Sequence, residues 1–436
     1  MSLLERPEAQ ALLEDAAMTA RTVGGCADRL TGFLARYLPL FYREEPRKHL
    51  RLAVEGRLSG LERKTSEPIA READVPRRGL QRFVGAGEWD DEAAMAELRR
   101  HAGEELGDPQ GVLILDPSGF AKKGQDSCGV ARQWCGRLGK VDNCQVGVYL
   151  AYASPAGSAL VDRQLYLPEE RAADRQHRKK THVPKEVVFQ EKWRIGLQLI
   201  DRSGAELPFA WVTGDDEFGR ASAFRAQLRV RRLRYVLDIP CNTLIRVVGA
   251  PAAPGRRWPA WQRVDQWGRE QPSWRWRKIR IRDGTKGPLV VRALTARVQA
   301  RDEDGCAGKL ERLTVIRTID RQPQVWYTLS NALEEVSDET VVQVHSQRHG
   351  IEDLLQAAKG EVGLGHYEVR SWTGWHHHMT LCLLALWFLV LEKRRLGKKN
   401  TGHHALPSAR DLHGALTPPA APICSHRSKS KRSSAA

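Results

Sequence analysis

Four polar residues recur at helical spacing in segment 345–359: His345, Arg348, Glu352 and Lys359. On one α-helix they fall within roughly 60° of arc, beside an apolar stripe that a core can bury. Such a helix presents one carboxylate between cations, which suits a metal ligand that meets a phosphate. A carboxylate in this setting can also be only the surface partner of a neighbouring Arg or Lys. The other acidic residues of the chain therefore decide between the two interpretations.

Two aspartates follow short apolar runs far upstream of that helix. Asp116 ends the run 112–115 and leads into a Pro/Ser/Gly turn, and Asp215 follows the run 208–213 and Gly214. Both runs are typical of buried strands with an acidic residue at the exit. Asp216 is the alternative if the second strand ends one residue later. Two acids at strand ends and one on a helix suffice for a divalent-cation site.

Carboxylates are the ligands that Mg²⁺ or Mn²⁺ prefers. Two such ions, about 3.5 to 4 Å apart, can activate an attacking oxygen and stabilise the leaving one in phosphodiester displacement. We therefore predict a two-ion site on Asp116, Asp215 and Glu352. A zinc site is not indicated, because the 8 cysteines are scattered and form no CxxC pair. The run 376–378, three adjacent histidines, is interpreted as polar packing or phosphate contact.

The charge of the chain favours a polyanionic partner. Its 436 residues carry 69 Lys and Arg against 53 Asp and Glu, a formal net charge of +16. Nucleic acid is the leading candidate, although an Arg-rich surface can also reflect a GC-rich genome. No membrane association is expected, because the longest apolar run, 379–391, is too short to span a bilayer. The N-terminus lacks the features of an export signal, so we expect a cytoplasmic, nucleoid-associated bacterial protein.

Residues 1–107 predict a helical domain, with amphipathic stretches at 8–22, 26–38, 49–58 and 92–106. Segment 69–85 predicts a short helix, a break at Pro76 and a second helix bearing Arg77, Arg78 and Arg82. This pattern is compatible with a helix-turn-helix that reads a terminal inverted repeat. A helical cap with exposed arginines explains it equally well.

From residue 108 the pattern becomes mixed. Strands are predicted at 112–116, 145–153 and 159–166, then a helix at 186–200, the strand before Asp215, a helix at 221–231 and a strand at 234–239. This βββαβαβ order predicts an α/β (α+β) class and resembles the ribonuclease H-like fold used by transposases. The catalytic domain is expected in two parts, 108–242 and 339–399, the second with the Glu352 helix.

Residues 243–338 predict a β-rich insertion between the two parts. It holds Trp residues interleaved with cations that include Arg275 and Arg277, a composition that can clamp phosphates and stack on unpaired bases. The alternative is a small Trp core with a charged rim. Residues 400–436, rich in Pro, Ser and basic residues, predict a flexible basic tail.

Several strings together resemble transposases of the insertion-sequence seven-hundred-and-one family, a DDE group with a Tyr-Arg-Glu-Lys signature. They are LILDPSGFAKKG, SCGVARQWCGRLGKVDNCQVGVYLA, WVTGDDEFG and IEDLLQAAKGEVGLGHYEVRSWTGWHHHMTL. The resemblance implies Asp116, Asp215 and Glu352 as the metal-binding triad, with Arg348 and Lys359 near the cut strand. His345 stands where the family has Tyr, and a protonated imidazole could hold the flanking phosphate there.

The resemblance also implies cut-and-paste transposition of double-stranded DNA, with element ends and target DNA as substrates and a homodimer in the synaptic complex. Lys122, Lys123 and Arg132 are further candidates for DNA contact. Two other functions stay open at this point. One is a catalytically inactive DNA-binding protein or repressor derived from a transposase, and the other is a different ribonuclease H-like nuclease such as a junction resolvase.

Overall fold

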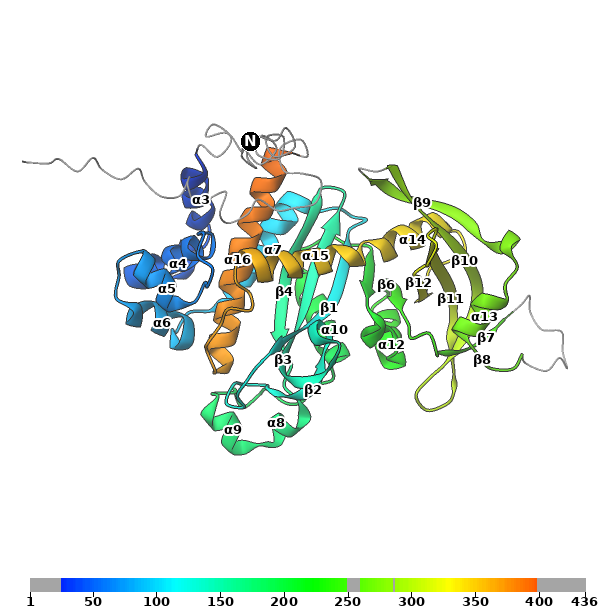
Figure 1. Ribbon diagram of the computed structural model, residues 1–436, viewed down its shortest axis with the longest axis horizontal. Coiled ribbons are helices and arrows are strands. Elements are labelled where there is room, and N and C mark those ends of the chain that lie inside the picture. The colour runs from blue at the N-terminus through cyan, green and yellow to red at the C-terminus, as the bar shows by residue number, and fades with distance from the viewer. Residues whose placement is uncertain (1–24, 249–258, 285–286, 398–436) are drawn as a thin grey trace, which may run out of the picture.

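A mixed β-sheet of 12 strands runs through the computed structural model, which describes residues 25–248, 259–284 and 287–397 (Figure 1). Its central part contains β1 (Val112–Ala121), β2 (Ala131–Cys135), β3 (Lys140–Ser154), β4 (Gly157–Leu165), β5 (Trp211–Gly214) and β6 (Arg234–Asp238). β3 pairs antiparallel with β1 and carries β2 and β4 on its other edge. β5 and β6 follow on the far side of β1 and run parallel to it. The first four residues of β1 are buried, as expected for a strand covered on both faces.

Helices cover both faces of this central sheet. α16 (Trp372–Leu396) packs against β4, and α10 (Lys192–Ser203) packs against β3 and β4. α16 is long and apolar enough to cross a membrane by length and composition, but 94% of its apolar window is buried inside the protein. It is therefore a core helix, as predicted for 379–391. The shorter helices are α8 (Glu169–Ala173), α9 (Arg175–Lys180), α11 (Asp216–Gly219), α12 (Ser222–Val230) and the 3₁₀ turn η3 (Gly136–Leu138).

The described N-terminal residues are helical, with elements where the sequence predicts them. They form α3 (Cys26–Ala35), the 3₁₀ turn η2 (Leu38–Leu40), α4 (Glu44–Arg57), α5 (Ser66–Glu72), α6 (Arg77–Ala86) and α7 (Asp91–Leu106). Pro76 separates α5 from α6, since it stands before the first turn of α6. The helix predicted at 8–22 and the tail at 400–436 lie outside the described residues. These helices share one hydrophobic core with the central sheet, because α4, α6 and α7 pack on α16.

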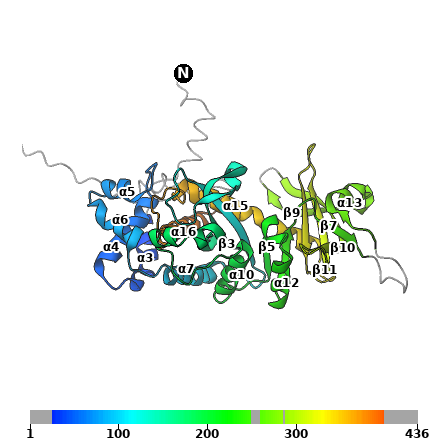
Figure 2. The ribbon, with the colours of Figure 1, turned by 90° about the horizontal axis from the view of Figure 1, so that it is seen from below.

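The segment after β6 is rich in strands, at the positions predicted for the insertion. It contains β7 (Leu244–Val247), β8 (Gln262–Arg263), α13 (Val264–Glu270), the 3₁₀ turn η4 (Ser273–Arg275), β9 (Arg277–Gly284), β10 (Gly287–Arg301), β11 (Ala307–Thr318) and β12 (Val325–Ser330). β12 pairs antiparallel with β6, so this part continues the central sheet. A second core, with Trp267 and Leu294, fills the space under α13. In both views the β-rich part lies at the opposite end of the molecule from α3–α6 (Figures 1 and 2).

The single helix expected through 345–359 is two helices. α14 (Asp338–Ser346) and α15 (Arg348–Glu361) meet at Gln347. They run from the β-rich part to the central sheet, where α15 packs on β1 and β4 (Figure 1). His345 therefore belongs to α14, whereas Arg348, Glu352 and Lys359 belong to α15.

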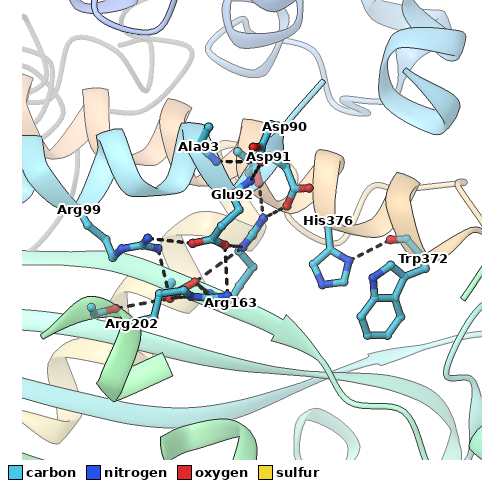
Figure 3. Close-up of polar contacts among 12 residues, drawn as sticks. Asp90, Asp91, Glu92, Ala93, Arg99, Arg163, Arg202, Trp372 and His376 are labelled. Atoms are coloured by element: carbon cyan, nitrogen blue, oxygen red, sulfur yellow. Dashed lines mark hydrogen bonds and ion pairs between the residues drawn. The ribbon is translucent and has the colours of Figure 1, made fainter. Parts of the chain in front are cut away.

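A buried charge network joins α7 to the central sheet (Figure 3). Asp162 on β4 is fully buried and lies 3.3 Å from Arg99 Nη1 and 2.7 Å from Arg202 Nη2. Arg163, also buried, pairs with Asp91 at the start of α7 and donates to Thr380 of α16. Four elements thus meet at this network, in which Asp162, Arg99 and Arg163 are buried and need their partners, whereas Arg202 and Asp91 are partly exposed.

We predict that Asp162→Asn lowers the free energy of unfolding by about 3 kcal/mol, because it leaves Arg202 and Arg99 short of a buried anion. Chemical denaturation measures this. Glu67→Gln is the control, because Glu67 pairs with Arg77 on the exposed surface and such pairs contribute about 0 to 1 kcal/mol. Equal effects of the two substitutions would contradict a structural role for the network.

Candidate active site

Asp116 and Asp215 lie side by side where the pairing of two parallel strands ends. The pairing of β1 with β5 ends at Leu115 and Gly214, and each aspartate is the next residue of the chain. β1 itself does not end at Asp116 as predicted, because its pairing with β3 continues to Ala121. Asp116 has no pairing partner on the β5 side, because the β1–β5 pairing has already ended there. Its position therefore does not depend on a turn at the end of β1.

α11 fixes the second aspartate. Asp215 caps this helix by accepting a hydrogen bond from the backbone N–H of Glu217 at 3.1 Å. Gly219 lets α11 approach β6 closely, since an added Cβ would lie 1.7 Å from the carbonyl oxygen of Asp238. The end of β6 is thereby placed next to Asp215.

A cleft of about 1460 Å³ opens in front of these strand ends. Its lining contains all three predicted acids together with two of the predicted cations: Asp116, Asp215, Glu352, Arg348 and Lys359. The lining also includes four aromatic side chains, namely Trp134, Tyr166, Phe189 and Trp193. Residues separated by more than 200 positions in the sequence thus face one solvent-accessible space.

Both aspartates resist ionisation, because burial and neighbouring carboxylates disfavour their charged forms. Burial, followed by the proximity of Asp215, raises the pKa of Asp116 well above its usual range. Burial, with Glu217 and Asp216 next to it, raises the pKa of Asp215 from 3.8 to about 7. A group of carboxylates that resists ionisation is one that a bound cation would stabilise.

Glu352 is arranged differently from the two aspartates. Its carboxylate is half-exposed and accepts a hydrogen bond from Arg348 Nη1 at 2.9 Å. A hydrogen bond with His349, opposed by partial burial, lowers its pKa, and Arg348 lowers it further. Glu352 is therefore an ionised side chain held by Arg348 at the side of the cleft.

Asp238, which sequence reasoning missed, holds Arg348. It ends β6, and its carboxylate oxygens lie 3.1 Å from Arg348 Nε and 3.0 Å from His345 Nε2. Burial opposes the charge of Arg348, but Asp238 and Glu352 outweigh it and raise the Arg348 pKa. The only sequence signal was an aspartate ending a third apolar strand in the βαβ series.

His345 does not face the cleft in this conformation. Its side chain is buried, pairs with Asp238 and packs against the Trp326 ring at 5.7 Å between centroids. Phosphate contact by His345 stays a prediction, and it would require release from Asp238.

The predicted cations differ in their availability. Lys359 donates to Ser118 Oγ at 2.7 Å, inside the cleft. Lys122 lies over the Tyr367 ring at 3.4 Å, and burial lowers its pKa to about 8. Lys123 and Arg132 are exposed on the neighbouring loop and β2.

The two predicted cations of the β-rich part already have partners. Arg275 donates to Gln271 and lies over the Trp267 ring. Arg277 is exposed and lies 3.6 Å from Asp338 Oδ2 at the start of α14. Neither lines the cleft.

The histidine run is polar packing, one of the two interpretations of the sequence. All three rings are buried in α16, where His376 pairs with the Trp372 carbonyl and His377 stacks on Trp89 at 3.9 Å. His378 contacts the Leu364 carbonyl and Arg57. Burial lowers the pKa of His376 to about 4, so the ring is neutral.

The donor types of the cleft fit a hard divalent cation, although its conformation is open. In the described ranges, no three His, Cys, Asp or Glu side chains lie close enough together to hold one ion. Asp116 and Asp215 occupy adjacent strand ends and are crowded by like charge, which suits a shared ion. Glu352 must turn away from Arg348 to join them.

Comparison with known proteins decides the family. A family model described as DDE superfamily endonuclease matches residues 36–288, more than half of the chain. The chain belongs to the DDE superfamily endonucleases. These enzymes depend on divalent metal ions, in agreement with the acidic cleft. The match covers Asp116 and Asp215 and ends before α15, so it does not include Glu352.

A curated relative supports a more specific resemblance. This DDE superfamily endonuclease is 27% identical over 216 residues to a protein of Microchaete diplosiphon named "Probable transposase for insertion sequence element IS701". The alignment covers 48% of the chain and 53% of the relative. The chain thus spans about half the length of the curated relative it matches.

We predict that Asp215 contributes a loss of free energy of unfolding to the metal-free protein as pH rises from about 4 to about 7. Because the folded-state pKa of Asp215 is raised to about 7, the unfolded chain ionises first and gains stability relative to the fold. Asp215→Asn, which keeps the helix cap, should remove part of this loss. It should stabilise the protein at pH 8 by about 1 to 2 kcal/mol, after allowance for solvent screening.

Denaturation in EDTA at pH 5 and pH 8 measures this difference. Asp201→Asn is the control, because Asp201 is a surface partner of Arg231 and should give no gain at pH 8. Destabilisation by Asp215→Asn at both pH values would show that the carboxylate supports the fold.

Proposed function

We propose that this endonuclease is a DNA transposase that binds the terminal inverted repeats of an insertion sequence and carries out cut-and-paste transposition. The observation that carries the proposal is the single cleft shared by Asp116, Asp215, Glu352, Arg348 and Lys359. The resemblance to the probable IS701 transposase supports the choice of reaction. The order of the central strands supports a ribonuclease H-like catalytic part, split between 108–242 and 339–399.

Asp116, Asp215 and Glu352 would hold two Mg²⁺ or Mn²⁺ ions, which supply an activated attacking oxygen and stabilise the leaving one. The protein's own residues do the positioning. Lys359, fixed by Ser118, presents an ammonium group to the phosphate at the scissile bond. Arg348, freed from Glu352 as that carboxylate turns inward, keeps its second contact with Asp238 and can face the same phosphate.

DNA recognition is assigned to regions outside the cleft of a chain whose formal net charge is +16. α5 and α6, separated by Pro76, are the proposed helix-turn-helix for the inverted repeat, with 1–107 as the DNA-binding domain. The β-rich insertion 243–338, Lys122, Lys123, Arg132 and His345 are proposed to contribute DNA contacts. A homodimer would pair two element ends, in the cytoplasm at the nucleoid.

We predict that the protein cleaves linear duplexes carrying the DNA that borders its coding frame, in Mg²⁺ or Mn²⁺ and not in EDTA. Asp116→Asn, Asp215→Asn and Glu352→Gln should each lower the rate at least roughly 100-fold, the scale of losing one group that stabilises transition-state charge. Asp353→Asn is the control for Glu352, because it is the next residue of α15 and is exposed.

The other functions predict different results in the same assay. Binding of the bordering DNA without cleavage in either metal would identify an inactive DNA-binding protein or repressor. Preference for branched DNA over element ends would identify another ribonuclease H-like nuclease. Cleavage that survives in all three variants would refute the assigned triad.

We further predict that Asp238 is a positioning residue. In Asp238→Asn, Arg348 loses its second carboxylate and holds Glu352 more strongly, so more divalent cation is needed to recruit Glu352. The half-saturating Mg²⁺ concentration for cleavage should rise several-fold in Asp238→Asn. In Asp238→Glu it should lie closer to the value of the parent protein. A lower rate with an unchanged Mg²⁺ requirement would mean that Asp238 only supports the fold.

A further inference from the structure

Three cations lie in one row across neighbouring strands of the β-rich part. Lys278 of β9 is directly opposite Arg292 of β10, and Arg292 is directly opposite Arg317 of β11. Because side chains alternate along a strand, the three share one face of the sheet. It is the face of Leu294, which packs under α13, and not the face on which α14 lies.

Like charges directly opposite each other in adjacent strands destabilise a sheet. Within the described ranges, no carboxylate lies within ion-pair distance of Lys278, Arg292 or Arg317, and Arg292 Nε is buried without a hydrogen-bond partner. Burial, and then Arg292, lower the pKa of Arg317. This row therefore differs from Arg277, which already has Asp338 as a counter-ion.

An aromatic ring holds one end of the row in place. The Arg317 guanidinium lies over the Trp276 ring at 3.9 Å from its centroid. This contact orients a planar donor group while its charge stays uncompensated. The row is thus a preorganised set of donors without an anion.

The row is on the same end of the sheet as the acidic cleft. β12 pairs with β6 through Thr328 and Asp238, and Val325 of the same strand is opposite Arg317. Along β12, Val325 lies three residues, or about 10 Å, from Thr328. The row itself extends over two strand spacings, or about 10 Å, from β9 to β11. A ligand that occupies the cleft and continues past the end of β6 would reach Arg317 first, then Arg292 and Lys278.

We propose that Lys278, Arg292 and Arg317 form a binding site for the backbone phosphates of DNA outside the cleavage cleft. The identity of the ligand rests on the proposed function, because a DNA strand is the polyanion expected to leave the cleft in this direction. The site reads no sequence, since its contacts are to phosphate oxygens alone. Its role is to hold the strand while the chemistry takes place elsewhere.

The test compares Arg292→Gln and Arg317→Gln with the parent protein for binding of a fluorescent duplex of the bordering DNA, in EDTA over a range of salt concentrations. Each variant should bind more weakly, and the slope of log affinity against log salt should fall by about 1 per lost phosphate contact. Lys309→Gln is the matched control. It removes an exposed cation from the opposite end of β11 and should change neither quantity.

A second measurement separates binding from folding. Removing one of the opposed cations relieves repulsion, so Arg292→Gln should unfold at a temperature equal to or higher than that of the parent. A lower unfolding temperature, or a salt slope unchanged in both variants, would overturn the proposal. A parent protein that binds DNA through Arg292 but does not cleave would leave this site standing and refute the transposase assignment alone.

Discussion

The parallel pairing of β1 with β5 is the constraint on which the rest of the site depends. It brings Asp116 and Asp215 to adjacent positions although they are far apart in the chain. Burial raises both pKa values, with Asp215 adding to the shift of Asp116 and with Glu217 and Asp216 adding to that of Asp215. The fold therefore maintains a local electrostatic cost that hydrophobic packing around β1, β3 and β5 must offset. Such a cost is typical of functional sites, where stability is given up for chemistry.

The position of Glu352 is determined by a series of ionic contacts and not by strand pairing in the sheet. Asp238 ends the next parallel strand and holds Arg348, which in turn holds Glu352. The junction of α14 and α15 at Gln347 makes this possible, because it lets His345 turn inward to Asp238 while Glu352 stays at the cleft. His345 is thus part of the support for Arg348 in this conformation.

The strong periodic signals of the sequence predicted the elements and the lining of the cleft. The apolar runs before Asp116 and Asp215 gave the two strands, and the i, i+4, i+11 spacing from Arg348 placed its acid and lysine on one face of α15. The continuation of β1 past Asp116 depends on long-range pairing with β3, which local patterns do not encode. Asp238 was missed because its role arises only when β6 and α14 meet in space. The cationic row across β9, β10 and β11 depends on strand register, which spacing along one strand cannot reveal.

The shared core of α16 and the N-terminal helices has a geometric consequence. α6 packs on α16, α16 packs on β4, and the buried charges around Asp162 tie α7 to the same sheet. A DNA duplex bound by α6, as proposed, would lie at a fixed distance from the carboxylates of the cleft. The packing between α6 and the central sheet would then fix the number of base pairs between the recognised sequence and the cut. An insertion or deletion of a few base pairs in that interval would rotate the scissile phosphate away from the cleft.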